Sequence, residues 1–377
     1  MEKLGLYIHI PFCVKKCAYC DFYSVCDLAL REDYVKALIA QIANSRTAGR
    51  NHVVDSIYIG GGTPSLLTGE QMLRILTAVR SAFKVSEDAE ITMEANPGTL
   101  DTEKISAYHE AGINRLSIGL QSADDDELNR LSRIHTRSQF ESSFILARLE
   151  GFENISVDIM YALPGQSEEL LSETLDYVIA MDPDHISFYG LKVEPNTPFG
   201  QNPQIEEAIP DEDRQYDMYL NSAKKLEESG FIQYEISNFA KPGAECRHNI
   251  KYWKCDEYLG FGPAAHSFFD GKMFSYVKDV NKFLAFPTDS HALMDECSVP
   301  SFDEVATQFV MLGFRMRGGI DIVEYGERFG DDFEARYKER MKPFLLKQYI
   351  LKTKKGYRLS RRGMLISNYI LSEILEF

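Results

Sequence analysis

Short apolar runs alternate with amphipathic stretches through the first two-thirds of the chain. The amphipathic stretches have helical spacing, as in Arg31–Ser45, where Tyr34, Leu38 and Ile42 lie four residues apart. A second helix, Glu70–Phe83, has its expected apolar face at Leu73, Leu76, Val79 and Phe83. The apolar runs predict six strands, Leu4–Ile10, Ser56–Gly60, Glu90–Ala95, Arg115–Leu120, Ile155–Met160 and His185–Gly190. Six strand–helix units predict an α/β fold with a parallel sheet, curved into a full or partial (β/α)6 barrel.

The pattern changes after the sixth strand. Residues 195–210 are rich in Pro, Asn and Gln and predict an exposed loop, and a long helix is expected over Asp211–Ser229. We expect a core domain over residues 1–240, a Gly- and aromatic-rich linking segment over 241–300 and a small, mostly helical domain over 301–377. The elements expected in the small domain are the helices Phe302–Arg315, Ile320–Phe329 and Phe333–Lys347, the hairpin Ile350–Leu359 and the helix Arg361–Phe377.

That order of elements resembles a winged helix, and the hairpin carries a basic turn. The chain has 377 residues and a formal net charge of -16, which argues against a nucleic-acid binder because phosphate contacts need clustered Lys and Arg. We therefore interpret the small domain as a packing domain. No run approaches the ~20 apolar residues that span a bilayer, and the apolar run at the N-terminus is too short for a signal peptide. The sequence predicts a cytoplasmic protein with no transmembrane segment and leaves peripheral membrane contact open.

Four of the seven cysteines fall within fourteen residues, and three of them have the spacing C-x3-C-x2-C: Cys13, Cys17 and Cys20. They follow the first predicted strand, so three thiolates can converge on one metal centre with little loop-closure cost. A structural zinc site needs a fourth ligand, which Cys26 or His9 would have to supply. A [4Fe–4S] cluster held by three thiolates keeps one iron open for a substrate or cofactor, whereas electron-transfer clusters have four cysteine ligands. Unligated cysteines are the third interpretation, and the cluster is the one we favour.

The C-x3-C-x2-C motif at this position resembles that of the radical SAM superfamily. Members chelate the open iron with the amino and carboxylate groups of S-adenosylmethionine (SAM), and one electron then yields a 5′-deoxyadenosyl radical. The superfamily prefers an aromatic residue before the third cysteine, which is Tyr19 in this chain. It also places a GGGTP run after the second strand to bind the SAM amino group, as residues 60–64 would here. By itself such a run is a tight turn whose glycines expose N–H groups and let a ligand approach.

Polar residues near the ends of successive strands complete the expected pocket. Glu94, Gln121 and Asp158 each interrupt an apolar strand pattern, and singly each would be a satisfied core or rim group. Three of them in one barrel favour a shared ligand pocket, where carboxylates and an amide suit ribose hydroxyls and an ammonium group.

The whole chain from Tyr7 onward resembles the HemN/HemW branch, the oxygen-independent coproporphyrinogen III oxidases and their heme-chaperone relatives. The matching motifs are YIHIPFCVKKCAYCDF, YIGGGTPSLL, NRLSIGLQS, RLSRIHTR and DIMYALPGQ. The resemblance implies a first SAM at Tyr7, Gly61 and Glu94. Around a second SAM or substrate site it places Tyr19, Gly62, Thr63, Gln121, Arg133, Asp158 and Leu191.

Two features turn the resemblance from the oxidases toward the heme chaperones. The oxidases carry a fourth cysteine two residues after the third, where this chain has Phe22, and a longer segment before the first strand. Residues 248–253, HNIKYW, resemble the chaperones' HNxxYW signature, which implies heme as a cofactor and His248 as its axial ligand. Tyr252 and Trp253 would pack on the macrocycle, while a structural histidine in an aromatic core is the alternative. His266 is a second candidate ligand, and burial is the expectation for Cys246 and Cys255.

The sequence thus predicts a heme chaperone that keeps a SAM-binding cluster and passes heme to an unidentified acceptor protein. The alternative is an oxidase that converts coproporphyrinogen III to protoporphyrinogen IX, and a more distant one is a radical SAM enzyme with another substrate.

Overall fold

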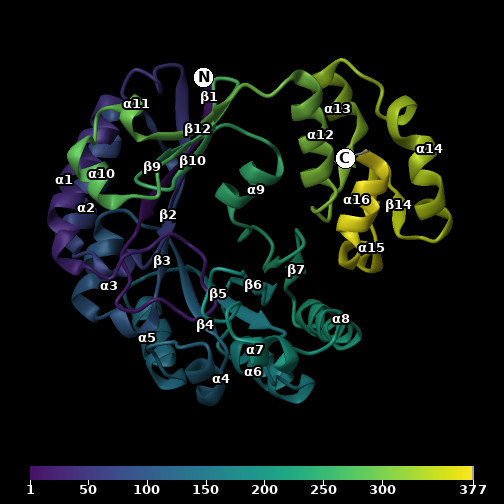
Figure 1. Ribbon diagram of the computed structural model, residues 1–377, viewed down its shortest axis with the longest axis horizontal. Coiled ribbons are helices and arrows are strands. Elements are labelled where there is room, and N and C mark those ends of the chain that lie inside the picture. The colour runs from purple at the N-terminus through teal and green to yellow at the C-terminus, as the bar shows by residue number, and fades with distance from the viewer. Residues whose placement is uncertain (376–377) are drawn as a thin grey trace.

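A computed structural model, which describes residues 1–375, places six parallel strands at the centre of one curved sheet (Figure 1). The order β1-β2-β3-β4-β5-β6 follows the chain, so each strand is joined to its neighbour by a helical crossover. The central strands are β1 Glu2–Ile10, β2 His52–Gly61, β3 Val85–Ala95, β4 Arg115–Gln121, β5 Asn154–Tyr161 and β6 His185–Gly190. This arrangement confirms the predicted α/β partial barrel, with every predicted strand present.

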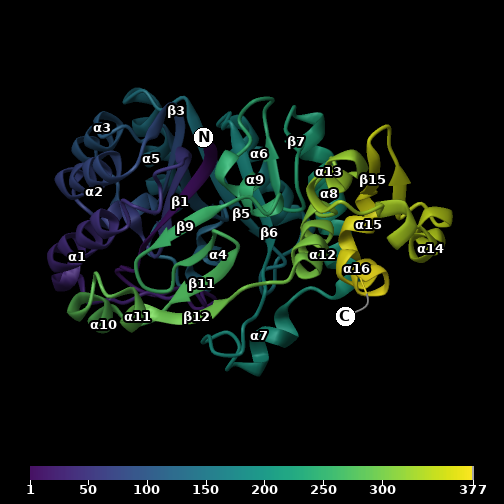
Figure 2. The same cartoon turned by 90° about the horizontal axis from the view of Figure 1, so that it is seen from above.

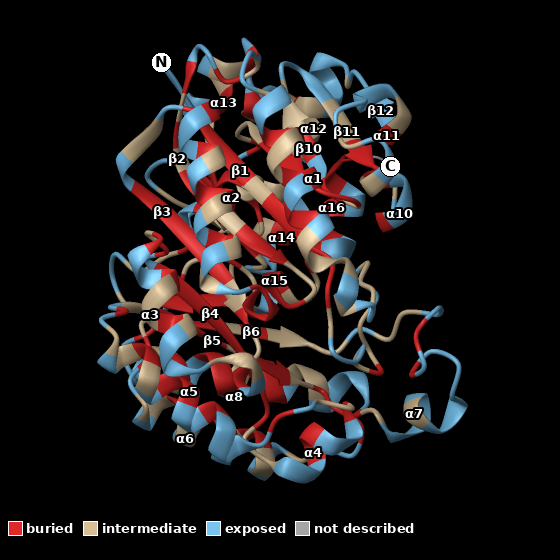
Figure 3. Ribbon diagram, turned by 90° about the vertical axis from the view of Figure 1, so that its left-hand side faces the viewer, coloured by how far each residue is buried: buried red, intermediate tan, exposed pale blue. Residues whose placement is uncertain are grey.

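The crossover helices cover the outer face of this sheet and turn their buried side toward it (Figure 3). Two of them begin with reciprocal capping boxes, Thr68 with Gln71 and Thr136 with Gln139, which satisfy the first free amides of each helix. The helices of the core are α1 Arg31–Asn44, α2 Gly69–Ala82, α3 Thr102–Glu110, α4 Asp125–Arg130, α5 Arg137–Leu149, α6 Glu168–Ala180, α7 Pro203–Ala208 and α8 Glu212–Glu228. The short helix α7 lies within the segment that the sequence predicts as a loop.

The sheet extends beyond the barrel on both sides, to twelve strands in total. On one side β9 pairs parallel with β1 and begins an antiparallel series, while on the other β8 pairs antiparallel with β6. Residues 241–300, which the sequence predicts as a linking segment, thus supply one helix of the interior and four strands of the main sheet. The added elements are β7 Ile232–Gln233, β8 Asn238–Ala240, α9 Arg247–Trp253, β9 Tyr258–Phe261, β10 His266–Phe269, β11 Lys272–Tyr276, α10 Val280–Ala285, α11 Ser290–Leu293 and β12 Met294–Ser298.

The C-terminal residues have a hydrophobic core of their own, separate from that of the barrel. They form a three-stranded sheet in the order β13-β15-β14 with helices around it. The elements are α12 Phe302–Gly313, β13 Ile320–Asp321, α13 Ile322–Phe329, α14 Phe333–Leu346, β14 Ile350–Lys352, β15 Gly356–Leu359, α15 Arg361–Leu365 and α16 Ser367–Leu375. The predicted final helix is thus two helices with a break at Ile366, and its last two residues lie outside the described range.

The C-terminal group of helices lies at the end of the molecule opposite α1, α2 and α3 (Figure 2). Two arginines of this group, Arg317 and Arg361, bind the carboxylate of Glu227 at the end of α8. Arg328 of α13 donates to the carbonyls of Lys254 at 2.7 Å and Cys255 at 2.5 Å, just past the end of α9. A cation at that end of a helix is favourable because the helix dipole is negative there. The small domain therefore holds α9 in place.

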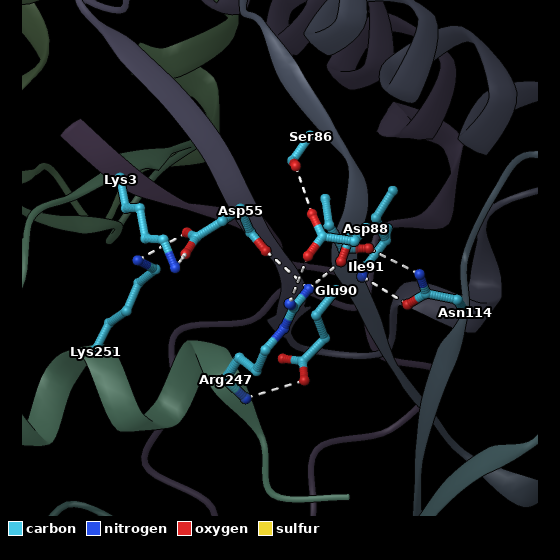
Figure 4. Close-up of polar contacts among 10 residues, drawn as sticks. Lys3, Asp55, Ser86, Asp88, Glu90, Ile91, Asn114, Arg247 and Lys251 are labelled. Carbon is cyan, nitrogen blue, oxygen red and sulfur yellow. Dashed lines mark hydrogen bonds and ion pairs between the residues drawn. The ribbon is translucent and has the colours of Figure 1, made fainter. Parts of the chain in front are cut away.

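Helix α9 lies on the concave side of the sheet and is anchored to β2 and β3 (Figure 4). The carboxylate of Glu90 accepts the backbone amides of Arg247 at 2.9 Å and His248 at 3.1 Å, the first two residues of the helix. On β2, Asp55 pairs with Lys251 at 2.7 Å, and both side chains are largely buried. These contacts fix α9 to β2 and β3.

No helix within residues 1–375 is both long and apolar enough to cross a membrane.

Candidate functional site

The three predicted cluster ligands lie on the loop that follows β1. This loop is fixed to the second strand, because the amides of Gly62 and Thr63 donate to the carbonyls of Ile10 at 2.8 Å and Phe12 at 2.7 Å. Cys13, Cys17 and Cys20 are half-buried and none forms a disulfide. All three line one cavity of about 580 Å³ at the carboxyl ends of the strands, which is where barrel folds carry their sites.

The geometry of these thiols disfavours a mononuclear zinc site. Among the described residues, Cys13, Cys17 and Cys20 do not form a group whose sulfurs all lie within 4.8 Å of one another. A single zinc ion with bonds of about 2.3 Å needs such close sulfurs, whereas a cubane cluster bound through three separate irons needs wider spacing. The proposed fourth zinc ligands are also unsuitable. Both ring nitrogens of His9 are 3.0 Å from other partners, and Cys26 is exposed. The residues therefore fit an iron–sulfur cluster.

Nine further residues that the sequence singles out line the same cavity. They are Tyr19, Gly61, Gly62, Thr63, Glu94, Gln121, Arg133, Asp158 and Leu191. Two of them touch the predicted cluster ligands. The hydroxyl of Thr63 lies 3.6 Å from the sulfur of Cys13, and a guanidinium nitrogen of Arg133 lies 3.6 Å from the sulfur of Cys17. The fold thus gathers residues from the loop after β1 and from β2, β3, β4, β5 and β6 at one place.

Glu94 is held in the cavity by two hydrogen-bond donors. Its carboxylate accepts the hydroxyl of Tyr58 at 2.9 Å and the amide of Gly61 at 3.0 Å. Burial and the nearby charge of Asp158 raise the pKa of Glu94 to about 7. The carboxylate is therefore positioned to bind a cationic or hydroxyl-bearing ligand. Such a ligand would offset the free-energy cost of burying the charged form of Glu94.

The N–H groups of the glycine run are not free to bind a ligand, although the sequence predicts that they are. The amides of Gly61, Gly62 and Thr63 are all used within the protein. Gly61 has φ +109°, and a Cβ there would lie 2.4 Å from the ring of His9, so only glycine fits. An amino group of a ligand needs acceptors rather than donors, and Glu94 supplies them beside this run.

The remaining polar groups are oriented by neighbours that the sequence does not single out. Tyr189 donates to the side-chain oxygen of Gln121 at 2.7 Å, and Ser117 donates to Asp158 at 3.0 Å. Burial raises the pKa of Asp158. Like Tyr58, both donors are polar residues inside otherwise apolar strands, and that interruption is the one signal in the sequence that points to them.

A second cavity, of about 500 Å³, adjoins the first and shares Asp21, Phe22, Gly61 and Glu94 with it. Tyr7, expected at the SAM site, lines this second cavity, where its hydroxyl lies 3.0 Å from Nδ1 of His9. Residues of α9, the strands β9–β11 and helix α12 complete the wall. The exposed Phe22 thus stands at the junction of the two cavities, at the position where the resemblance implies a fourth cysteine in the oxidases.

His248, which the sequence predicts as an axial heme ligand, does not line either cavity. The side chain is fully buried, with Nδ1 3.0 Å from the hydroxyl of Ser56 and Nε2 2.8 Å from the hydroxyl of Tyr252. Burial lowers the pKa of His248 to about 3, so the ring is neutral and both nitrogens are already engaged. Its ring also stacks on Tyr58, whose hydroxyl reaches Glu94. His248 is therefore a structural histidine that orients Tyr252 and Tyr58.

The other residues of the HNIKYW segment divide between the cavity and the packing. Tyr252 lines the second cavity, whereas Trp253 is half-buried and lies outside both cavity walls. Cys246 and Cys255 are buried, as expected.

Models of two known protein families match this chain. The model of the radical SAM superfamily matches residues 7–178, and that of the HemN C-terminal domain matches residues 301–366. The solved structure of coproporphyrinogen III oxidase (HemN) from Escherichia coli superimposes with a TM-score of 0.87 over 99% of this chain and 90% of that chain. At 22% identity this similarity shows a common fold.

Two curated relatives are closer in sequence. Heme chaperone HemW of Escherichia coli (strain K12) is 41% identical over 283 residues, which are 74% of this chain and 74% of that protein. Heme chaperone HemW of Haemophilus influenzae is 34% identical over 100% of this chain and 98% of that protein. Since this identity extends over the whole chain, the chain belongs to the HemW family within the radical SAM superfamily.

Proposed function

We propose that the protein is a heme chaperone that binds heme beside a SAM-ligated [4Fe–4S] cluster and transfers it to an acceptor protein. The observation that carries the proposal is the pair of adjoining cavities, one at the cysteine loop and one walled by aromatic residues. Relatives of the same length that are named heme chaperones support it.

In this proposal Cys13, Cys17 and Cys20 would hold the cluster and leave one of its irons open for SAM. When bound, such a cluster supplies one electron to SAM. Glu94, Gly61 and Tyr7 orient the first SAM. The other predicted residues of the first cavity would contact a second SAM or the edge of the macrocycle. They are Tyr19, Gly62, Thr63, Gln121, Arg133, Asp158 and Leu191.

The affinity for SAM should rise with pH, because SAM carries a sulfonium cation and Glu94 binds best to it as a carboxylate. With the pKa of Glu94 at about 7, the carboxylate is mostly protonated at pH 6 and mostly ionised at pH 8. Asp158, Tyr58 and Tyr7 are the other titratable groups around it. We expect SAM affinity to increase by up to about tenfold across that interval, since the ionised fraction of a group with this pKa rises from about one-tenth at pH 6 to about nine-tenths at pH 8.

Equilibrium dialysis of SAM against the anaerobic protein measures this dependence, and Glu94→Gln is the matched control. The variant keeps the shape of the side chain but has no titrating group, so its profile should be flat. A wild-type profile that is equally flat, with the cluster intact by absorbance, would show that Glu94 does not meet the cation.

The alternative function is oxidative decarboxylation of coproporphyrinogen III. One anaerobic assay separates the two functions: the reconstituted protein receives SAM, a reductant and either hemin or coproporphyrinogen. We expect stoichiometric uptake of hemin, its transfer to an added apoprotein and no protoporphyrinogen above the protein-free background. Protoporphyrinogen formed over many turnovers would overturn the chaperone proposal in favour of the oxidase.

A further inference from the structure

The wall of the second cavity contains an apolar row of residues from three strands. Phe268 of β10 lies opposite Met273 of β11 and opposite Tyr258 of β9 in the antiparallel registers. Directly opposed residues of antiparallel strands project from the same face of a sheet. Tyr258, Phe268 and Met273 therefore form one row across the sheet, and all three line the cavity. An extended apolar row of this kind suits a planar macrocycle better than a small polar ligand.

His266 belongs to the same face, because alternate residues of a strand share a side and it lies two residues before Phe268. Its imidazole is exposed and lines the cavity. Within the described part of the chain, the ring of His266 has no hydrogen bond, ion pair or ring contact. Both nitrogens are therefore free to bind a metal ion.

The other seven histidines lack this combination. Five are buried, and each is hydrogen-bonded within the protein: His9, His52, His135, His185 and His248. The remaining two, His109 and His291, are exposed but line neither cavity. His9 is the other histidine of the cavity wall, and its two nitrogens are engaged by Tyr7 and the carbonyl of Tyr23.

We propose that His266 is the axial ligand of heme in the second cavity, with the macrocycle resting on Tyr258, Phe268 and Met273. This inference rests on the proposed heme-binding function and assigns its ligand and its wall. Neutral imidazole is a good ligand for heme iron, and His266 approaches from the side of the apolar row. The shared residues Phe22 and Glu94 place the opposite part of the macrocycle next to the cluster cavity.

Lys278 supplies the counter-charge for a propionate. It is the one lysine or arginine among the lining residues, which otherwise include the acidic Asp21, Glu94 and Asp256. Lys278 is exposed, and no described residue forms an ion pair with it. A heme propionate at this rim therefore gains a charge partner without displacing another one.

In this arrangement His248 acts on the cavity only through Tyr252. Its Nε2 lies 2.8 Å from the hydroxyl of Tyr252, which lines the same cavity from α9. His248 is thus a positioning residue for the cavity wall, which separates its expected effect from that of a ligand. Loss of His248 should weaken heme binding without changing the iron ligation.

Anaerobic titration of hemin into the full-length, cluster-loaded protein tests the assignment. His266→Ala should weaken hemin binding by at least about tenfold. Loss of a residue that only orients a metal ligand typically lowers metal affinity by a factor of about 10–100, and loss of the ligand itself should cost no less. It should also shift the Soret band, and added imidazole should restore the band. Lys278→Gln should weaken binding by up to about fivefold, the worth of an exposed ion pair, with the Soret band unchanged.

His291→Ala is the matched control, since it removes another exposed histidine from outside the cavities, and it should bind hemin as the wild type does. If the wild type takes up hemin and His266→Ala has the same affinity and Soret band, the ligand assignment is wrong while the chaperone proposal stands. If the wild type takes up no hemin, the proposed function itself fails. If His248→Ala alone changes the Soret band, the ligand is His248 and the inference is overturned.

Discussion

Cys17→Ala should abolish the iron–sulfur cluster and, with it, the binding of SAM. Two thiolates rarely hold a [4Fe–4S] cluster, and no other cysteine of the described residues lines the cluster cavity. Cys26 is exposed and outside the cavity, and both nitrogens of His9 are occupied. Arg133, whose guanidinium lies 3.6 Å from the Cys17 sulfur, would keep its bond to the carbonyl of Gly119 at 2.8 Å. The fold should therefore survive the loss of the cluster.

Iron and sulfide analysis of anaerobic protein measures this outcome. The wild type should contain about four irons and four sulfides per chain, and Cys17→Ala should contain close to none. Cys26→Ala is the control from the same loop and should keep the full content. A wild type with one zinc per chain and no iron-linked absorbance would contradict the cluster, as would Cys17→Ala with an unchanged iron content.

Glu90→Ala should lower the free energy of unfolding by about 3–5 kcal/mol. The carboxylate accepts two backbone amides at the start of α9, and charge-assisted hydrogen bonds are worth roughly 1.5–3 kcal/mol each. Its removal also leaves the fully buried Arg115 without one of the carboxylates that compensate its charge. Because α9 carries Tyr252 in the cavity wall, hemin binding should weaken in the same variant.

Denaturant unfolding of the cluster-free chain gives the free energy, with Glu87→Ala as the comparison. Glu87 belongs to the same strand but is exposed, so its loss should change stability by less than about 0.5 kcal/mol. If Glu90→Ala is no less stable than Glu87→Ala, the contacts in Figure 4 do not anchor the helix.

The barrel and its cluster loop are predictable from the sequence because their signals are local. Each central strand is a buried apolar run followed by an amphipathic helix, and the cysteine spacing lies within one loop. The buried face of a helix is harder to predict: the spacing places Leu73 on the buried side of α2, but Leu73 is exposed, whereas Met72, Ile75 and Ala82 are buried. Two overlapping apolar stripes run along this helix, and the position of the sheet decides between them.

The strands β9–β12 were missed because their stability comes from pairing partners far away in the chain. Tyr258 and Gly5 are neighbours in the sheet although 253 positions separate them in the sequence. The sequence predicts this Gly- and aromatic-rich stretch as a linking segment, whereas its residues Tyr258, Phe268 and Met273 line the second cavity. A sequence does not record such pairing when the strands are short.

His248 illustrates the same limit for a functional residue. The signature around it marks a conspicuous histidine, but a buried imidazole held by Ser56 and Tyr252 looks the same in sequence as a free one. His266 is inconspicuous in the sequence, because it lies in a short strand beside a cavity that forms only when β9–β11 join the sheet. The choice between the two histidines needed the fold.

Iron anomalous diffraction from crystals of the heme-loaded, cluster-reconstituted protein tests the central claim most directly. The account predicts one compact iron peak at Cys13, Cys17 and Cys20 and a second, single-iron peak in the adjoining cavity within bonding distance of His266. A heme iron bound at His248, or one lying on the outer surface away from Tyr258 and Phe268, would contradict the account.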